Sequence, residues 1–232
     1  GRAVLPYARA LLKSAEKFEM AAEGNHVCIG CSGNIATYYI ASSIKNFVDT
    51  ETTPISWDIR AAANSDITDL LENGEIDLAA TEWVDPRPGT ITKPWRREPL
   101  VVVVSPSHPL ASEKSISLKT LLKLELIGGE RGSGTGALLR KVIGPNAKNL
   151  KIIRNLHSTE AVKNAVRADL GSSIMLEGAV YDEVKSGQLV SLTIEGIKLE
   201  KTFHLAHPAE LPKEALPSRL VNFLTQEEQY EK

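Results

Sequence analysis

The sequence predicts an α/β protein of two similar lobes built from strand–helix–strand units. Short apolar runs alternate with amphipathic helical stretches along most of the 232 residues, which is typical of parallel sheets covered by helices. This alternation occurs twice over stretches of similar length, at residues 27–81 and 124–176. Between them, residues 100–104 form an apolar run that suits a strand buried on both faces. Such a strand would carry the chain from one lobe to the other.

Residues 2–22 predict a helix ahead of the lobes. Its apolar positions alternate spacings of four and three, as in a heptad seam, at Val4, Ala8, Leu11, Ala15, Phe18 and Ala22. Two interpretations stay open: an amphipathic helix packed on its own domain, or a paired helix at a dimer axis. The chain begins with Gly1 rather than Met, so we expect an upstream segment to have been removed.

The elements of the first lobe follow from the pattern between residues 27 and 81. We expect strands at 27–31, 55–60 and 76–81, and helices at 34–48 and 64–71. Asn73 and Gly74 should end the second helix.

The second lobe repeats this order after the crossover run. Strands are expected at 124–127, 150–154 and 173–176, with helices at 134–142 and 159–167. A last strand at 202–207 and a helix at 217–226 should return to the first lobe. The predicted domains are therefore an N-terminal helix at 1–23, a first lobe at 26–100 and 204–230, and a second lobe at 101–203.

Composition excludes several classes of protein. Hydrophobic residues make up 42% and charged residues 24% of the chain, which is typical of a globular protein. The net charge of −2 lacks the basic excess of a chain that grips nucleic acid by itself. No apolar run approaches the roughly 18 residues of a membrane span, and residues 1–22 are too often interrupted by charge for a secretory signal. Two cysteines make no disulfide scaffold, so we expect a cytoplasmic protein.

Three segments together resemble one family. They are residues 1–12 (GRAVLPYARALL), residues 100–111 (LVVVVSPSHPLA) and residues 158–171 (STEAVKNAVRADLG). They look like the linker helix, the crossover strand and a helix ending in a glycine turn of LysR-type transcriptional regulators. Asp169 stands where the family usually has Gly, and Leu176-Glu177 where it often has Leu-Pro. These departures do not change the expected fold, but they make the identity of the ligand harder to transfer from the family.

The resemblance implies a fold of the type 2 periplasmic-binding class with a small-molecule effector in the cleft between the lobes. It also implies a homodimer or homotetramer, contact with RNA polymerase, and promoter DNA bound through an N-terminal winged helix-turn-helix that this chain lacks. We therefore expect no specific DNA binding by the chain alone and at least a dimer in solution.

The loop at residues 31–34 is the first candidate ligand site. It lies between a predicted strand and a predicted helix, where Ser32, Gly33 and Asn34 let an anion approach the backbone and supply hydrogen-bond donors. Thr81 ends the third strand and would complete the same edge. The alternative is that Ser32 or Asn34 only caps its helix.

The second candidate site is the loop at residues 129–136, GERGSGTG. Ser133, Gly134 and Thr135 precede a helix and suit a phosphate or carboxylate, yet the lysine of a nucleotide-hydrolysing loop is absent, so we expect binding without turnover. Ser158 precedes the next helix and faces the same predicted cleft, although capping explains it equally well. For Trp83 two interpretations stay open: its side chain lines the predicted pocket, or it only covers the sheet.

Metal and catalytic chemistry lack support in the sequence. Cys28 and Cys31 are three apart on a strand and should point to opposite faces, so with His26 they make no zinc site, and Cys31 should be the one nearer the pocket. No strained serine-nucleophile turn occurs. We expect no cofactor, no metal and no enzymatic activity.

The leading hypothesis is thus the effector-sensing domain of a bacterial regulator that binds a small anion, such as sulfate, sulfite or a short carboxylate. A transporter's solute-binding protein of the same fold is the first alternative, although the heptad helix disfavours it. An enzyme on the same two-lobed scaffold is the second.

Overall fold

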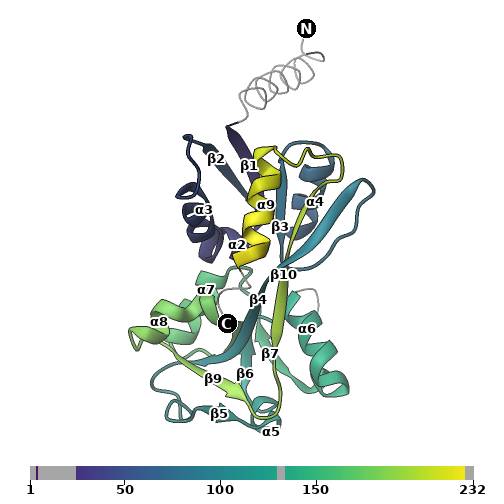
Figure 1. Cartoon of the computed structure of the whole chain (residues 1–232). Coiled ribbons are helices and arrows are strands. Elements are labelled where there is room, and N and C mark those ends of the chain that lie inside the picture. Colours follow the sequence, from purple (N-terminus) through teal and green to yellow (C-terminus); the bar gives the residue numbers. More distant parts are fainter. Residues whose placement is uncertain (1–3, 5–24, 130–133, 228–232) are drawn as a thin grey trace. The chain divides into compact units, whose positions relative to one another are not determined.

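The computed structural model describes residue 4, residues 25–129 and residues 134–227 (Figure 1). The predicted linker helix at residues 1–23, apart from the exposed Val4, lies outside the described residues. Within the described part the chain divides into two units. The first holds residues up to Arg96 and from His204 onward, and the second is Arg97–Phe203.

Parallel strands form the centre of the first unit, as the sequence predicts. β1 (His26–Ser32) pairs in parallel with β2 (Ser56–Ala62) on one side and with β3 (Leu78–Thr81) on the other. β10 (Glu200–Pro208) adds to β3 in the antiparallel direction, with His204 opposite Thr81. The sheet order is therefore β2-β1-β3-β10.

The described residues of this unit form the helices α2 (Gly33–Tyr38), α3 (Ile40–Val48), α4 (Asn64–Glu72) and α9 (Leu216–Glu227). The single helix expected at 34–48 is wrong, because Tyr39 leaves the helical backbone region at φ −124°, ψ −45°. α9 packs against β1 and α3 (Figure 1), where the rings of Phe47 and Phe223 are 5.5 Å apart. The C-terminal helix thereby closes the core of the first unit.

The second unit repeats this order of strands. β6 (Glu125–Ile127) pairs in parallel with β7 (Lys151–Arg154), and a parallel bridge joins Leu126 to Ser172 just before β8 (Ser173–Leu176). β8 in turn pairs antiparallel with β4 (Thr90–Val104). The order β7-β6-β8-β4 thus matches β2-β1-β3-β10 of the first unit.

Several parts of the second unit differ from the sequence prediction. β4 begins at Thr90, well before the apolar run at 100–104. The pattern did not predict the first half of this strand, because that half is only partly buried and carries charge. β9 (Val190–Ile194) and β5 (Ser115–Ile116) extend the sheet beyond β4 and were not predicted.

The helices of the second unit are α5 (Leu118–Leu121), α6 (Gly134–Ile143), α7 (Thr159–Arg167) and α8 (Tyr181–Lys185), with short 3₁₀ turns η1 (Gly144–Asn149) and η2 (Glu177–Val180). α7 has the bounds that the sequence predicts. It buries Val162 and Val166 in a cluster with Val103, Ile127 and Met175, which forms the core of this unit.

Parallel pairing fixes where the predicted ligand loops lie within each unit. β1 and β3 end at Ser32 and Thr81 on one edge of the first sheet, and β6 and β7 end at Ile127 and Arg154 on one edge of the second. Ligands of such sheets bind beyond the carboxyl ends of the strands. Among the described residues, no helix combines the length and apolar character needed to cross a bilayer.

Candidate functional site

Ser32 ends β1 with a buried hydroxyl that has no partner. Its side chain is only 4% exposed, and its Oγ makes no hydrogen bond within the described part of the chain. Ser32 occupies the N-cap position of α2 but makes no side-chain capping bond, so the capping interpretation is wrong for this residue. A buried hydroxyl without a partner is unfavourable unless something else binds it.

Asn34 contacts an acid rather than the helix backbone. Its Nδ2 donates a hydrogen bond of 3.0 Å to the Glu82 carboxylate, one residue beyond the end of β3. Asn34 therefore does not cap α2, and it places the negative charge of Glu82 beside the loop at residues 32–34. Gly33 between them is exposed, and nothing lies within 4 Å of the position that a Cβ would take there.

Asn64 is a residue of this edge that the sequence analysis missed. It is buried at the start of α4, where its side chain accepts from the Glu82 amide at 2.9 Å and donates to the Trp83 carbonyl at 3.3 Å. These two bonds fix the backbone that carries Glu82 and the exposed Trp83. The available signal was its place two residues after the end of β2, which corresponds to the place of Asn34 two residues after the end of β1.

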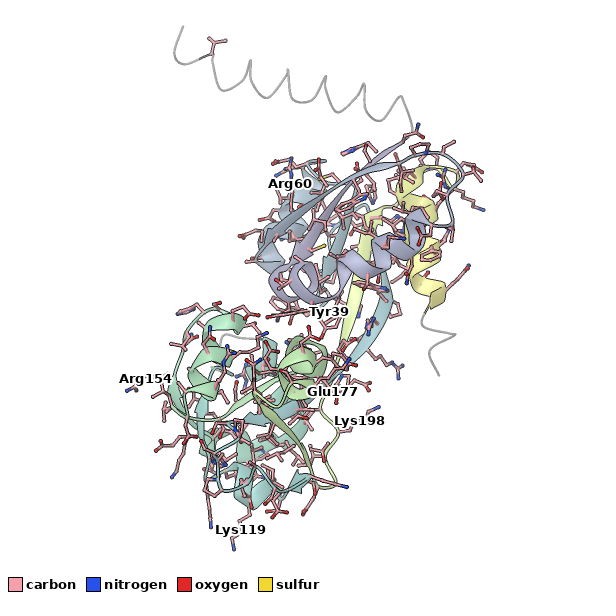
Figure 2. All side chains as sticks on the ribbon, turned by 90° about the vertical axis from the view of Figure 1, so that its left-hand side faces the viewer. Tyr39, Arg60, Lys119, Arg154, Glu177 and Lys198 are labelled. Atoms are coloured by element: carbon pink, nitrogen blue, oxygen red, sulfur yellow. The ribbon has the colours of Figure 1, made fainter. Side chains whose placement is uncertain are left out.

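Thr81 is buried at the same edge of the sheet. Its neighbour across the antiparallel pair is His204 on β10. Of the eight predicted ligand residues, the first unit thus brings together Ser32, Gly33, Asn34 and Thr81. Tyr39, labelled in Figure 2, is buried at the break between α2 and α3. The Arg96 guanidinium lies over the Tyr39 ring, 5.4 Å from the centre of that ring.

The second unit presents its candidate residues at the ends of β6 and β7. Gly134 and Thr135 open α6 and are partly buried, whereas Ser133 lies outside the described residues. Gly128 and Gly129 turn the chain after β6 with φ of +80° and +76°, a conformation that favours glycine. Ser158 follows β7 and accepts a hydrogen bond from the Ala161 amide at 3.4 Å, so it caps α7.

The two cysteines are buried and not bonded to each other. Burial, with a smaller contribution from Cys28, raises the pKa of the Cys31 thiol to about 12. Cys31 is fully buried, and its position nearer the pocket than Cys28 stays a prediction. His26 instead contacts Ser56 at 2.8 Å, and no cluster of His, Cys, Asp and Glu within the described residues is arranged to hold a metal ion.

Comparison with known proteins identifies the family. The model of the LysR substrate binding domain matches residues 21–229. This chain belongs to that family. The match covers two of the segments that resemble LysR-type regulators, residues 100–111 and 158–171, and the predicted resemblance to this family is confirmed.

Relatives of this LysR effector-binding domain are transcriptional regulators. The chain is 41% identical over 133 residues to a putative HTH-type transcriptional regulator protein PtxE of Stutzerimonas stutzeri, covering 57% of this chain and 68% of that protein. It is 26% identical over 215 residues to the RuBisCO operon transcriptional regulator of Allochromatium vinosum, covering 89% of this chain and 70% of that one.

Solved structures confirm the predicted fold of this LysR domain. The effector binding domain of QuiR in complex with shikimate matches with a TM-score of 0.73 at 23% identity, over 89% of this chain and 98% of that chain. The predicted type 2 periplasmic-binding-like fold with strand–helix lobes is therefore confirmed.

Proposed function

We propose that this LysR domain senses a small anion at the carboxyl-end edge of its first unit, with the Ser32 hydroxyl as a central donor. The observation that carries the proposal is the buried Ser32 Oγ without a partner. Leaving a buried donor unsatisfied costs about 1–3 kcal/mol, and a hydrogen bond to a charged partner contributes about 1.5–3 kcal/mol. A bound anion would remove the cost of the unsatisfied donor and add the contribution of the new hydrogen bond.

Glu82 narrows the class of anion. Its carboxylate is held at this edge by Asn34 and would repel a ligand that carries only negative charge. A short carboxylate that also bears hydroxyl groups can place its charge near Ser32 and donate a hydroxyl to Glu82. Shikimate, which is bound in the related QuiR domain, has this combination of groups. We therefore favour a hydroxylated carboxylate over sulfate or sulfite.

The proposed contacts follow the predicted residues. In the first unit they are Ser32, Gly33, Asn34 and Thr81. In the second unit they are Ser133, Gly134, Thr135 and Ser158, where backbone amides at the start of α6 and α7 favour negative charge. The hydroxyl of Ser158 accepts from Ala161 and still has a proton to donate.

The output we propose is regulation without turnover. The relatives are transcriptional regulators, so ligand binding would change promoter binding through a winged helix-turn-helix that is not among the residues of this chain. A homodimer or homotetramer acting in the cytoplasm, with RNA polymerase as a further partner, completes the proposal.

Ser32→Ala tests the proposed site because it has opposite effects with and without ligand. Removal of the unsatisfied hydroxyl should leave the free protein as stable as the wild type or more stable. The affinity for the best hydroxylated carboxylate from a thermal-shift screen should fall by about tenfold or more. Titration calorimetry in buffer free of sulfate and phosphate measures this affinity.

The matched control is Ser42→Ala on α3, whose exposed hydroxyl bonds the Tyr39 carbonyl. It should leave the affinity unchanged. Equal affinity in Ser32→Ala and wild type would refute the proposed role of Ser32. Ser32→Glu, which places a fixed negative charge in the site, should abolish binding.

A further inference from the structure

A pocket lies within the second unit, between α6, η1 and β7. Its volume is about 730 Å³, which is within the range of small-molecule sites. Arg140 of α6 and Lys148 of η1 line it, and Leu139, Leu150 and Ile152 supply apolar walls. None of the ligand residues proposed above contributes to this lining.

The charged side chains that line this pocket, Arg140 and Lys148, are both positive. Residues 134–154 contain five cations and no acidic residue, a local charge of +5 in a chain whose net charge is −2. Four of these cations have no ion pair with an acid of the described ranges: Lys141, Lys148, Lys151 and Arg154. The nearest acid by sheet register is Glu125, opposite Lys151 on β6. Such a field attracts anions.

A third cation lies at the end of the strand that lines the pocket. Ile152 lines the pocket from β7, and Arg154 ends the same strand two residues later, beyond an irregularity in the pairing of β7 with β6. Figure 2 shows Arg154 extending outward from the second unit. Among the described residues, its guanidinium donates to the Ile153 carbonyl at 2.7 Å, and the exposed side chain carries further N–H donors.

The apolar surface defines the other part of the ligand. Ile152, which lines the pocket, is 37% exposed, so the pocket offers hydrophobic contact beside its cations. Arginine and lysine together recognise phosphate, the first through a planar fork and the second as a point charge. A ligand that contacts both the cations and the apolar surface of the pocket carries a phosphate group joined to a flat or apolar group.

We propose that this pocket is a second ligand site that binds a nucleotide-like molecule, a phosphate joined to an aromatic ring system. Arg140 and Lys148 bind the phosphate, Arg154 adds charge at the rim, and the ring lies on Leu150 and Ile152. The site is separate from the edge at Ser32, so the domain can respond to two different molecules.

Titration calorimetry with adenosine 5′-monophosphate at low ionic strength tests the proposal. Wild-type protein should bind it, and the affinity should fall with added salt because the contacts are charged. Arg140→Gln with Lys148→Gln should weaken binding by about tenfold or more. Adenosine and inorganic phosphate alone should each bind more weakly than the intact probe, because each fills only one part of the pocket.

The matched control is Lys119→Gln with Lys123→Gln, which removes two exposed positive charges from the same unit. Lys119 lies well away from Arg154 in Figure 2, and this variant should change the affinity less than twofold. All variants are checked for an unchanged melting temperature.

Three results would overturn the proposal. The first is equal affinity in the pocket variant and the wild type. The second is loss of nucleotide binding in Ser32→Ala but not in the pocket variant, which would place the probe at the first site. The third is an altered sedimentation coefficient of the pocket variant with unchanged nucleotide affinity, which would make this face a contact between copies of the chain.

Discussion

Ser105 donates a hydrogen bond of 2.5 Å to the carboxylate of Asp169, linking the residue after β4 to the turn after α7. Ser105 is fully buried, and Asp169 has a left-handed backbone with φ of +59°. Glycine usually takes such a position at the end of a helix. The bond to Ser105 therefore gives a physical reason for an aspartate where the family usually has Gly.

Replacement of Asp169 should separate the hydrogen bond from the backbone strain. Asp169→Gly loses the bond but relieves the left-handed strain, whereas Asp169→Ala loses the bond and keeps the strain. We expect Asp169→Ala to be less stable than Asp169→Gly by about 1–2 kcal/mol, measured by urea unfolding. Asp169→Asn retains a hydrogen-bond acceptor and should lie closest to wild type. Equal stability of the Ala and Gly variants would contradict this account.

Lys163 is a buried cation that joins α7 to the segment after β8. Its Nζ contacts Glu160 and Glu183 at 2.7 Å each and the Ala179 carbonyl at 3.0 Å. Lys163→Met should cost about 3 kcal/mol, because Glu183 and the carbonyl lose their shared partner. Glu160→Gln, which changes an exposed partner of the same lysine, should cost less than about 1 kcal/mol. A comparable loss in both variants, measured by chemical unfolding, would count against this distinction.

The same lysine predicts a pH dependence. Burial by itself lowers the pKa of Lys163, but its bonds with Glu160 and Glu183 outweigh burial and raise the pKa above its ordinary value. A raised pKa means that the stabilisation is complete below the unfolded-state pKa and is lost as pH rises through the folded-state pKa. Between pH 6 and 9 the difference in unfolding free energy between wild type and Lys163→Met should therefore stay constant. A decline of that difference within this range would be inconsistent with the charged network.

Cys31 should be chemically inert in the folded protein. Its pKa of about 12, raised mainly by burial, leaves almost no thiolate at neutral pH, and the thiolate is the reactive form. Iodoacetamide at pH 8 should modify Cys31 only after denaturation, as read by mass spectrometry of peptides. Rapid labelling of native protein would show that the strand end opens.

Burial of Cys31 also affects stability at high pH. Because the pKa of Cys31 is raised from 9.0, the stabilisation by the neutral thiol is complete below pH 9 and declines as pH rises toward 12.

Gly171 should tolerate no side chain. A Cβ there would lie 2.9 Å from the backbone oxygen of Glu125, and φ is +152°, so Gly171→Ala must displace β6 or distort the turn. We expect a loss of about 3 kcal/mol. Gly196→Ala is the matched control, since its φ is +68° but nothing lies within 4 Å of the added carbon. It should cost only about 1 kcal/mol. Similar losses in both variants would show that strain, not crowding, decides the outcome at Gly171.

The sequence by itself determined the local elements and the family. Periodicity predicted β1, β2, α4, α6, α7 and β10 within a few residues, because a strand or helix that buries one face must repeat its apolar residues with a fixed period. Periodicity did not predict the first half of β4, which is charged and only partly buried. It also missed the break at Tyr39, because the apolar pattern continues through that residue without interruption. The three family segments identified the LysR domain because their order along the chain is specific.

The tertiary structure alone decided which polar groups are satisfied. Ser32 and Ser158 both stand between a strand and a helix, and both fit a cap by sequence. Only Ser158 caps its helix, whereas the Ser32 hydroxyl is buried without a partner, and Asn34 bonds Glu82, 48 residues away in the chain. Hydrogen bonds between distant segments form where parallel strands bring their ends together. The local sequence around each residue does not encode which distant residue will lie within hydrogen-bond distance. The donor that a ligand can use therefore emerges only when the chain is folded.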